Sequence, residues 1–313
     1  MKKTIKSPVE QRSATPAPSV PGLIHPIIIY PFRQPNDLSN LEELYRLVAK
    51  LDGSPRTYAK PVTVMARKTY FSVENDASFQ RFRKDVVAKH SNILDAWCVD
   101  TCQMWYSGLG AAFERGGPQD VYWLIPGDFN YGTPGGREVL SRLHDLPEII
   151  LELNQDFCIG EIATDHAHSK HLIDTYGTLA LLYTWFPKEA QEIRQFTERP
   201  RSEFFAIRHG FLGEVLRQRW FAYEQTMVTL LHAVFGGRRI SRFLVGQICD
   251  LPSDGESFAA ASAQVERTER VLKTLWRERH EKEPSWSTQF RALEMQSDHV
   301  RRAALTVLQN LLS

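Results

Sequence analysis

Residues 120–131 read DVYWLIPGDFNY, an apolar run that leads directly into a polar turn. The aromatic and β-branched residues from Val121 to Ile125 are typical of a buried β-strand. Pro126 and Gly127 end the strand, and the exit from it is polar. In sheets of mainly parallel strands, ligands bind beyond the carboxyl ends of the strands, so Asp128 is placed to meet a ligand.

Strand and helix patterns alternate on both sides of this segment. Short apolar, β-branched runs predict further strands at 27–32, 61–66, 157–162 and 203–208, whereas 93–99 is ambiguous between strand and helix. Apolar residues at helical spacing predict helices over 40–52, 77–90, 100–115, 136–152 and 171–197. This alternation predicts an α/β fold with a mostly parallel sheet flanked by helices.

The chain divides into three parts by composition and pattern. Residues 1–22 are rich in Pro, Ser, Thr and Ala and are expected to form a disordered leader. Residues 23–210 contain the strand–helix alternation and form the expected α/β core. Residues 211–313 are mainly helical in pattern, ending in a helix pair over 257–281 and 287–312. This tail is expected either to pack on the core or to form a contact between copies of the chain.

Composition excludes several classes of protein. The 313 residues are 42% hydrophobic and 24% charged, which is ordinary for a globular protein. The net charge of +1 gives no reason to expect a nucleic-acid binder. No apolar run approaches the roughly 18 residues of a membrane span. The four cysteines lack zinc-site spacing, and their use as free thiols predicts a reducing, cytoplasmic location.

Asp128 has two interpretations on local grounds. Its carboxylate is a hard oxygen ligand that can hold Mg²⁺ or Mn²⁺ against phosphate oxygens, and Gly127 has no side chain to block close approach. Alternatively, Asp128 caps a turn, because Pro-Gly-Asp-Phe-Asn is favourable turn chemistry.

Three segments, Ile27 to Phe32, Tyr106 to Arg115 and Asp120 to Tyr131, together resemble the nucleotide-sugar glycosyltransferases of the GT-A fold. The resemblance covers about residues 25–210 and implies a Rossmann-like, GT-A-like core with a helical C-terminal extension. In that family a DxD-type motif at a strand end holds a divalent metal and the donor diphosphate. This chain has Gly127-Asp128-Phe129-Asn130 instead, and an amide at Asn130 is a poorer ligand than a carboxylate.

The resemblance also implies roles for neighbouring residues. It implies that Gly127, Asp128 and Asn130 bind the diphosphate of a nucleotide-sugar donor, with Mg²⁺ or Mn²⁺ as the cofactor. Pro31, Phe32 and Arg33 would lie near the nucleotide base. The acceptor would be a hydroxyl group, whose proton needs a base.

Two carboxylates are candidates for that base, because each follows or ends the strand at 157–162. Glu161 closes the strand and Asp165 follows it, and a base needs hydrogen-bond reach and a suitable pKa. The same segment supports another hypothesis, a metal-dependent hydrolase that uses Asp165, His166, His168 and His171. A solvated polar loop is the third interpretation.

Arginines around the strand at 203–208 complete the set of candidates. Arg201 and Arg208 suit phosphate and are predicted to bind the cofactor, because a guanidinium fork matches an oxyanion. His209 is predicted to join Asp128 at the metal. A solvated face is the alternative for all three.

The sequence therefore favours a glycosyltransferase that moves a sugar from a nucleotide-diphosphate donor to a hydroxyl acceptor. The alternatives are the metal-dependent hydrolase and a non-catalytic scaffold that binds partners through its helical tail.

Overall fold

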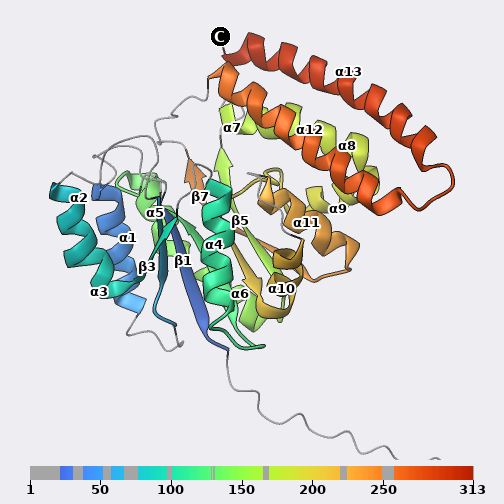
Figure 1. The fold of residues 1–313 in the computed structure, drawn as a ribbon. Coiled ribbons are helices and arrows are strands. Elements are labelled where there is room, and N and C mark those ends of the chain that lie inside the picture. Colours follow the sequence, from blue (N-terminus) through green and yellow to red (C-terminus); the bar gives the residue numbers. More distant parts are fainter. Residues whose placement is uncertain are drawn as a thin grey trace, which may run out of the picture.

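The protein, described here from a computed structural model, is built on a seven-stranded β-sheet flanked by helices (Figure 1). The structure describes residues 22–30, 38–51, 58–66, 77–96, 101–127, 129, 131–164, 169–218, 224–248 and 257–312. The strands are β1 (Ile24–Tyr30), β2 (Val62–Ala66), β3 (Asn92–Ala96), β4 (Val121–Pro126), β5 (Phe157–Thr164), β6 (Phe205–Arg208) and β7 (Ile240–Ile248). Their order is β3-β2-β1-β4-β6-β5-β7. The sheet is mostly parallel, because only β6 runs against its neighbours β4 and β5.

The helices fill the connections between strands and form the C-terminal part of the chain. Those of the first half are α1 (Leu38–Leu51), α2 (Ala77–Phe82), α3 (Ala88–His90), α4 (Thr101–Phe113), α5 (Pro134–Arg142) and α6 (Asp145–Glu152). Those of the second half are α7 (Ser169–Leu172), α8 (Ala180–Trp185), α9 (Pro187–Phe196), α10 (His209–Arg217), α11 (Gln225–Phe235), α12 (Phe258–His280) and α13 (Trp286–Leu312). Two π-helical segments are η3 (Arg83–Val87) and η4 (Ile173–Leu179).

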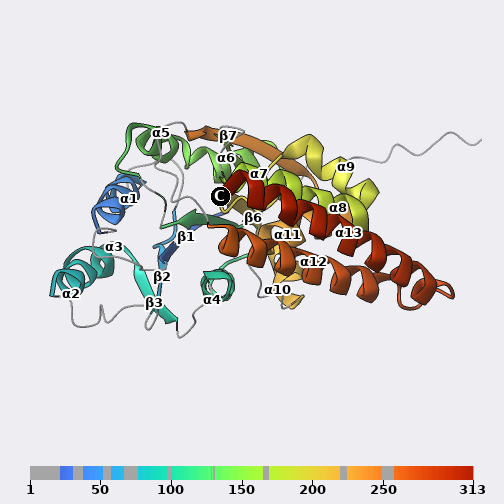
Figure 2. The same cartoon turned by 90° about the horizontal axis from the view of Figure 1, so that it is seen from above.

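The sheet separates two hydrophobic cores. Because successive strand residues point to opposite faces, Leu124 packs into the core beneath α4, α8 and α11, whereas its neighbour Trp123 packs into the core beneath α1, α5 and α6. Figure 2 shows α4 and α5 on opposite sides of the sheet. Because helices cover both faces of the sheet, β4 is buried at all six of its positions.

Most of the predicted elements are confirmed, and the ambiguous segment at 93–99 contains a strand, β3. Two details differ. The helix predicted over 136–152 is two helices, α5 and α6, interrupted around residues 143–144. Residues 240–248, in the part of the chain assigned to helices, form β7 at the edge of the sheet. β7 pairs with β5, which lies about eighty residues earlier, and local periodicity does not show such a long-range partner.

The glycines of α4 offer a matched test of how closely this helix packs. A Cβ atom at Gly108 would lie 2.6 Å from Val64 Cγ2 and 2.8 Å from Ile27 Cγ2, whereas one at Gly110 would meet nothing within 4 Å. Gly108→Ala is expected to lower the free energy of unfolding by about 1–3 kcal/mol through overpacking. Gly110→Ala should raise it by up to about 1 kcal/mol, because alanine favours a helix. Urea unfolding measures both, and equal effects would contradict this packing.

The helices α12 and α13 pack against α8 and η4. Figure 1 shows both C-terminal helices lying beside α8. A buried polar chain crosses this contact. Trp185 Nε1 donates to Ser297 Oγ at 2.9 Å, and Ser297 Oγ donates to Glu269 Oε1 at 2.7 Å. The C-terminal helices are therefore joined to the core by specific hydrogen bonds as well as apolar contacts. Among the described helices, none combines the length and the apolar character that crossing a membrane requires.

Candidate functional site

The carboxyl ends of β1 and β4 lie side by side at one edge of the sheet. Ile29 is in register with Pro126, and the backbone N–H of Gly127 donates to Ile29 O at 2.6 Å. Gly127 is buried at this junction. Parallel strands are about 4.8 Å apart, so the chain segments that follow Tyr30 and Gly127 start from neighbouring points.

These two segments contain most of the predicted donor-binding residues. The side chains and placement of five of them fall outside the described residues: Pro31, Phe32, Arg33, Asp128 and Asn130. The structure shows where the two segments that contain these residues leave the sheet, at the neighbouring ends of β1 and β4. These neighbouring strand ends are the geometric basis of the candidate site.

Glu161 lies at the same level of the sheet as the end of β4. Leu124 and Ile159 both pair with Phe205, so two residues further along, Pro126 and Glu161 are again level. They are two strand spacings apart, or about 10 Å. β5 therefore delivers its carboxylate to the same edge as the Asp128 segment.

The Glu161 side chain is held on the side away from β4. Its Oε1 accepts the backbone N–H of Glu198 at 3.1 Å and the hydroxyl of Thr197 at 3.5 Å. Its Oε2 lies 3.7 Å from Arg242 Nη1 on β7. Asp165, the other predicted base, follows the last residue of β5 and lies outside the described residues.

Arg201 is at the same edge, but its guanidinium is used in the interior. Its Nε donates to Asp174 Oδ1 at 2.7 Å, and Nη1 makes a short hydrogen bond to Gln264. Arg199 also contacts Asp174, at 3.4 Å, and donates to the carbonyl of Ile162 on β5 at 3.4 Å. These arginines tie η4 and α12 to the end of β5.

Arg208 and His209 lie at the opposite edge of the sheet. Arg208 is in register with Val121, the first residue of β4. β6 runs antiparallel to β4, so its end lies beside the start of β4, about six residues or 17–20 Å from the carboxyl edge. This placement corrects the assignment of His209 and Arg208 to the site of Asp128, because one site cannot include both ends of a strand.

Arg208 has a structural role at this amino edge. Its Nε donates to Gln155 O and its Nη2 to Ile150 O, each at 2.9 Å. Ile150 is near the carboxyl end of α6, where unpaired backbone carbonyls accept such bonds favourably. Burial lowers the pKa of Arg208, against the raising effect of Asp156.

Asp120 organises the polar cluster at the amino edge. Its carboxylate accepts the backbone N–H groups of Leu23 at 2.9 Å and Gly117 at 2.7 Å, and it pairs with His25 Nε2 at 2.7 Å. Burial would raise the pKa of Asp120, but these hydrogen bonds outweigh burial, and its pKa is lowered. The carboxylate thus fastens the start of β1 to the turn before β4.

His209 belongs to the same cluster and predicts a pH dependence of stability. Its Nδ1 is 2.8 Å from the hydroxyl of Tyr122, and burial lowers its pKa despite the attraction of Asp120. The unfolded chain therefore binds the proton more tightly, so stability should fall as the pH drops below about 6.5. Urea unfolding between pH 8 and pH 5 should show a smaller loss for His209→Gln than for the natural protein. Parallel pH profiles of the two proteins would contradict this role of His209.

Glu224 is a buried acid that sequence reasoning did not single out. It is fully buried at the start of α11, its Oε1 is 3.5 Å from Arg267 Nε, and neither oxygen has a hydrogen-bond partner among the described residues. Burial raises its pKa, against the charges of Arg201 and Arg267. The residues around Glu224 in the sequence predict a helix and nothing more. Whether one acidic residue of a helix is buried depends on distant parts of the chain, so the local sequence carries no sign of it.

The described residues contain no group of three histidine, cysteine or acidic side chains arranged to hold a metal ion. Of the proposed hydrolase cluster, only His171 is described, and its Nε2 lies 3.3 Å from Thr175 Oγ1. Asp165, His166 and His168 fall outside the described residues.

Solved structures with a similar fold include glucosyl-3-phosphoglycerate synthase from Mycobacterium tuberculosis. The TM-score is 0.56 at 11% identity, and the match covers 81% of this chain and 80% of the synthase. The same synthase in complex with Mn²⁺, UDP-glucose and glycerol 3-phosphate matches with a TM-score of 0.52 at 12% identity, covering 80% of each chain. A mycobacterial protein matches with a TM-score of 0.55 at 11% identity, covering 81% of this chain and 74% of that one.

No protein-family model matches the sequence, and no curated protein is similar to it in sequence. At 11–12% identity the structural matches establish likeness of fold. The synthase is a GT-A glycosyltransferase, so the GT-A-like α/β fold expected from the sequence is confirmed.

Proposed function

We propose that this protein transfers a sugar from a nucleotide-diphosphate donor to a hydroxyl acceptor. The observation that carries the proposal is the hydrogen bond between Gly127 N and Ile29 O, at 2.6 Å. It joins the ends of β1 and β4, from which the two donor-binding segments of the GT-A resemblance depart. The similarity of fold to the synthase supports the same proposal. That similarity extends over 81% of this chain, and the synthase binds UDP-glucose.

The donor would occupy the carboxyl edge between these segments. Pro31, Phe32 and Arg33 would contact the nucleotide base, and Asp128 with Asn130 would face the diphosphate. The side chains of Asp128 and Asn130 fit a divalent cation chemically. A carboxylate and an amide carbonyl offer the hard oxygen ligands that Mg²⁺ and Mn²⁺ prefer. When bound there, the cation would neutralise charge on the departing nucleotide diphosphate.

The transfer itself exchanges one bond for another. The bond between the anomeric carbon and the diphosphate oxygen breaks, and a bond to the acceptor oxygen forms. Glu161 or Asp165 would take the proton that the acceptor hydroxyl loses. For Glu161 to do so, its carboxylate must leave its contacts with Glu198 and Arg242. Most of the acceleration would come from positioning the two substrates and from fixed charges around the leaving group.

A thermal-shift panel of nucleotide sugars, with and without Mn²⁺, tests the proposal. A ligand that binds only the folded state stabilises it by about 2.7 kcal/mol at one hundred times its dissociation constant. At least one nucleotide sugar should raise the melting temperature, and Mn²⁺ should increase the shift. If no nucleotide sugar changes the melting temperature in either condition, the transferase assignment is refuted.

A further inference from the structure

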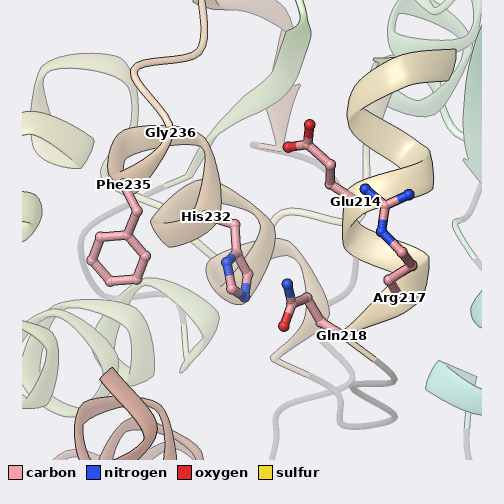
Figure 3. Close-up of a pocket in the computed structure, with 6 residues that line it drawn as sticks. All are labelled: Glu214, Arg217, Gln218, His232, Phe235 and Gly236. Carbon is pink, nitrogen blue, oxygen red and sulfur yellow. The ribbon is translucent and has the colours of Figure 1, made fainter. Parts of the chain in front are cut away.

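A groove lies between α10 and α11, apart from the carboxyl edge of the sheet. Its volume is about 340 Å³, which is within the range of small-molecule sites. Figure 3 shows Gln218, the residue that follows α10, and His232 of α11 facing each other across it. The residues that line it are Glu214, Arg217, Gln218, His232, Phe235 and Gly236.

Phe235 is the one aromatic residue among the described residues that line the groove. The guanidinium of Arg279, on α12, lies 3.9 Å from the centre of its ring. Arg279 is therefore beside the groove, on a residue that lines it. A guanidinium stacked on a ring keeps its in-plane N–H donors available to an oxyanion.

Arginines at and beside the groove outnumber its carboxylates among the described residues. Glu214, the one carboxylate in the described lining, is paired with Arg238, which lies next to the groove. Arg217 is exposed, and neither it nor Arg279 makes an ion pair with any residue that the structure describes. Two guanidinium groups are thus left without a counter-charge in the described part of the chain.

His232 adds an unsatisfied polar atom. Its Nε2 is buried without a hydrogen-bond partner among the described residues, an arrangement that ordinarily costs free energy. Burial lowers the pKa of His232, and the charge of Arg279 lowers it further. The neutral ring is therefore favoured, so His232 adds no further positive charge to the groove and can donate or accept a hydrogen bond there.

We propose that the α10–α11 groove is a second ligand site, which binds a phosphate group, either free or as a small phosphate ester. Arg217, which lines the groove, and Arg279, which lies beside it over the Phe235 ring, supply the charge. The amide of Gln218 and the imidazole of His232 supply further hydrogen bonds. Charge-assisted hydrogen bonds from guanidinium groups are the strong contacts for such a ligand. The site does not depend on the proposed sugar transfer, since none of its residues belongs to the carboxyl edge.

Calorimetric titration with inorganic phosphate, at constant ionic strength set by chloride, tests this site. The natural protein should bind phosphate saturably, and Arg217→Gln and Arg279→Gln should each weaken binding by about tenfold or more. Arg81→Gln is the matched control, because Arg81 is an exposed arginine on α2, which lies at the other end of the sheet from α10 and α11 (Figure 1). A parallel titration with glucose 6-phosphate distinguishes an ester from free phosphate by which of the two binds more tightly.

Three outcomes would overturn the proposal. These are the absence of saturable phosphate binding, equal binding by Arg217→Gln and the natural protein, and equal weakening by Arg81→Gln. Phosphate bound only at the carboxyl edge would give the second outcome, so a failure of this site is distinguishable from a failure of the proposed transferase. Circular dichroism of each variant confirms that the exposed substitutions leave the fold intact.

Discussion

Asp128→Asn is expected to lower the rate of sugar transfer by about 100- to 1000-fold and to leave the fold intact. The substitution keeps the size of the side chain and removes its charge. In the proposed site that charge holds the cation that faces the donor diphosphate. Loss of one fixed electrostatic contact to a developing charge commonly costs this much in rate.

Turnover of the nucleotide sugar that gives the largest thermal shift is the measurement. Asp85→Asn is the control, because Asp85 is an exposed aspartate of η3 on another part of the surface. Asp128→Asn should also abolish the effect of Mn²⁺ on donor binding. Unchanged turnover in Asp128→Asn would remove Asp128 from the site.

Asp174→Ala is expected to reduce the free energy of unfolding by about 3–5 kcal/mol. The Arg201 side chain is only 5% exposed and that of Asp174 only 2%. Removing the carboxylate leaves the guanidinium buried without its 2.7 Å partner. Breaking a buried ion pair costs this amount because a buried charge loses its compensation.

Urea denaturation measures this loss, with Glu43→Ala as the control. Glu43 pairs with Arg46, whose side chain is 66% exposed, and exposed pairs contribute about 0–1 kcal/mol. The double variant Asp174→Ala with Arg201→Met should be more stable than Asp174→Ala alone, since the uncompensated charge is gone. Similar destabilisation by Asp174→Ala and Glu43→Ala would show that the pair contributes little. If Asp174→Ala does not fold, Asp174→Asn provides the same comparison with a partner atom retained.

Local sequence patterns were sufficient for most elements of the fold. The apolar run from Val121 to Ile125 lies in β4, as predicted. Helices cover both faces of this strand, so its sequence needs no alternation of apolar and polar residues. The small residue at Gly108 faces β1 and β2, as the close approach of α4 to the sheet requires. These features depend on residues near in the chain, and periodicity and side-chain size report them directly.

The direction in which β6 runs in the sheet could not be predicted from the local sequence pattern. A strand of four residues has the same pattern whether it runs parallel or antiparallel. Because β6 is antiparallel, Arg201 before it lies at the carboxyl edge, while Arg208 and His209 at its end lie at the amino edge. The three residues were grouped by closeness in sequence, and the sheet separates them.

Composition and periodicity therefore predicted the α/β fold, which the structure confirms. The candidate ligand site where β1 and β4 end is a proposal that rests on this fold. Long-range contacts decided the rest: the position of β7, the burial of Glu224 and the pairing of Arg201 with Asp174. The physical reason is that secondary structure follows from neighbours a few residues away. Burial and ionic partners instead depend on chain segments that meet only after folding, and no local pattern records those meetings.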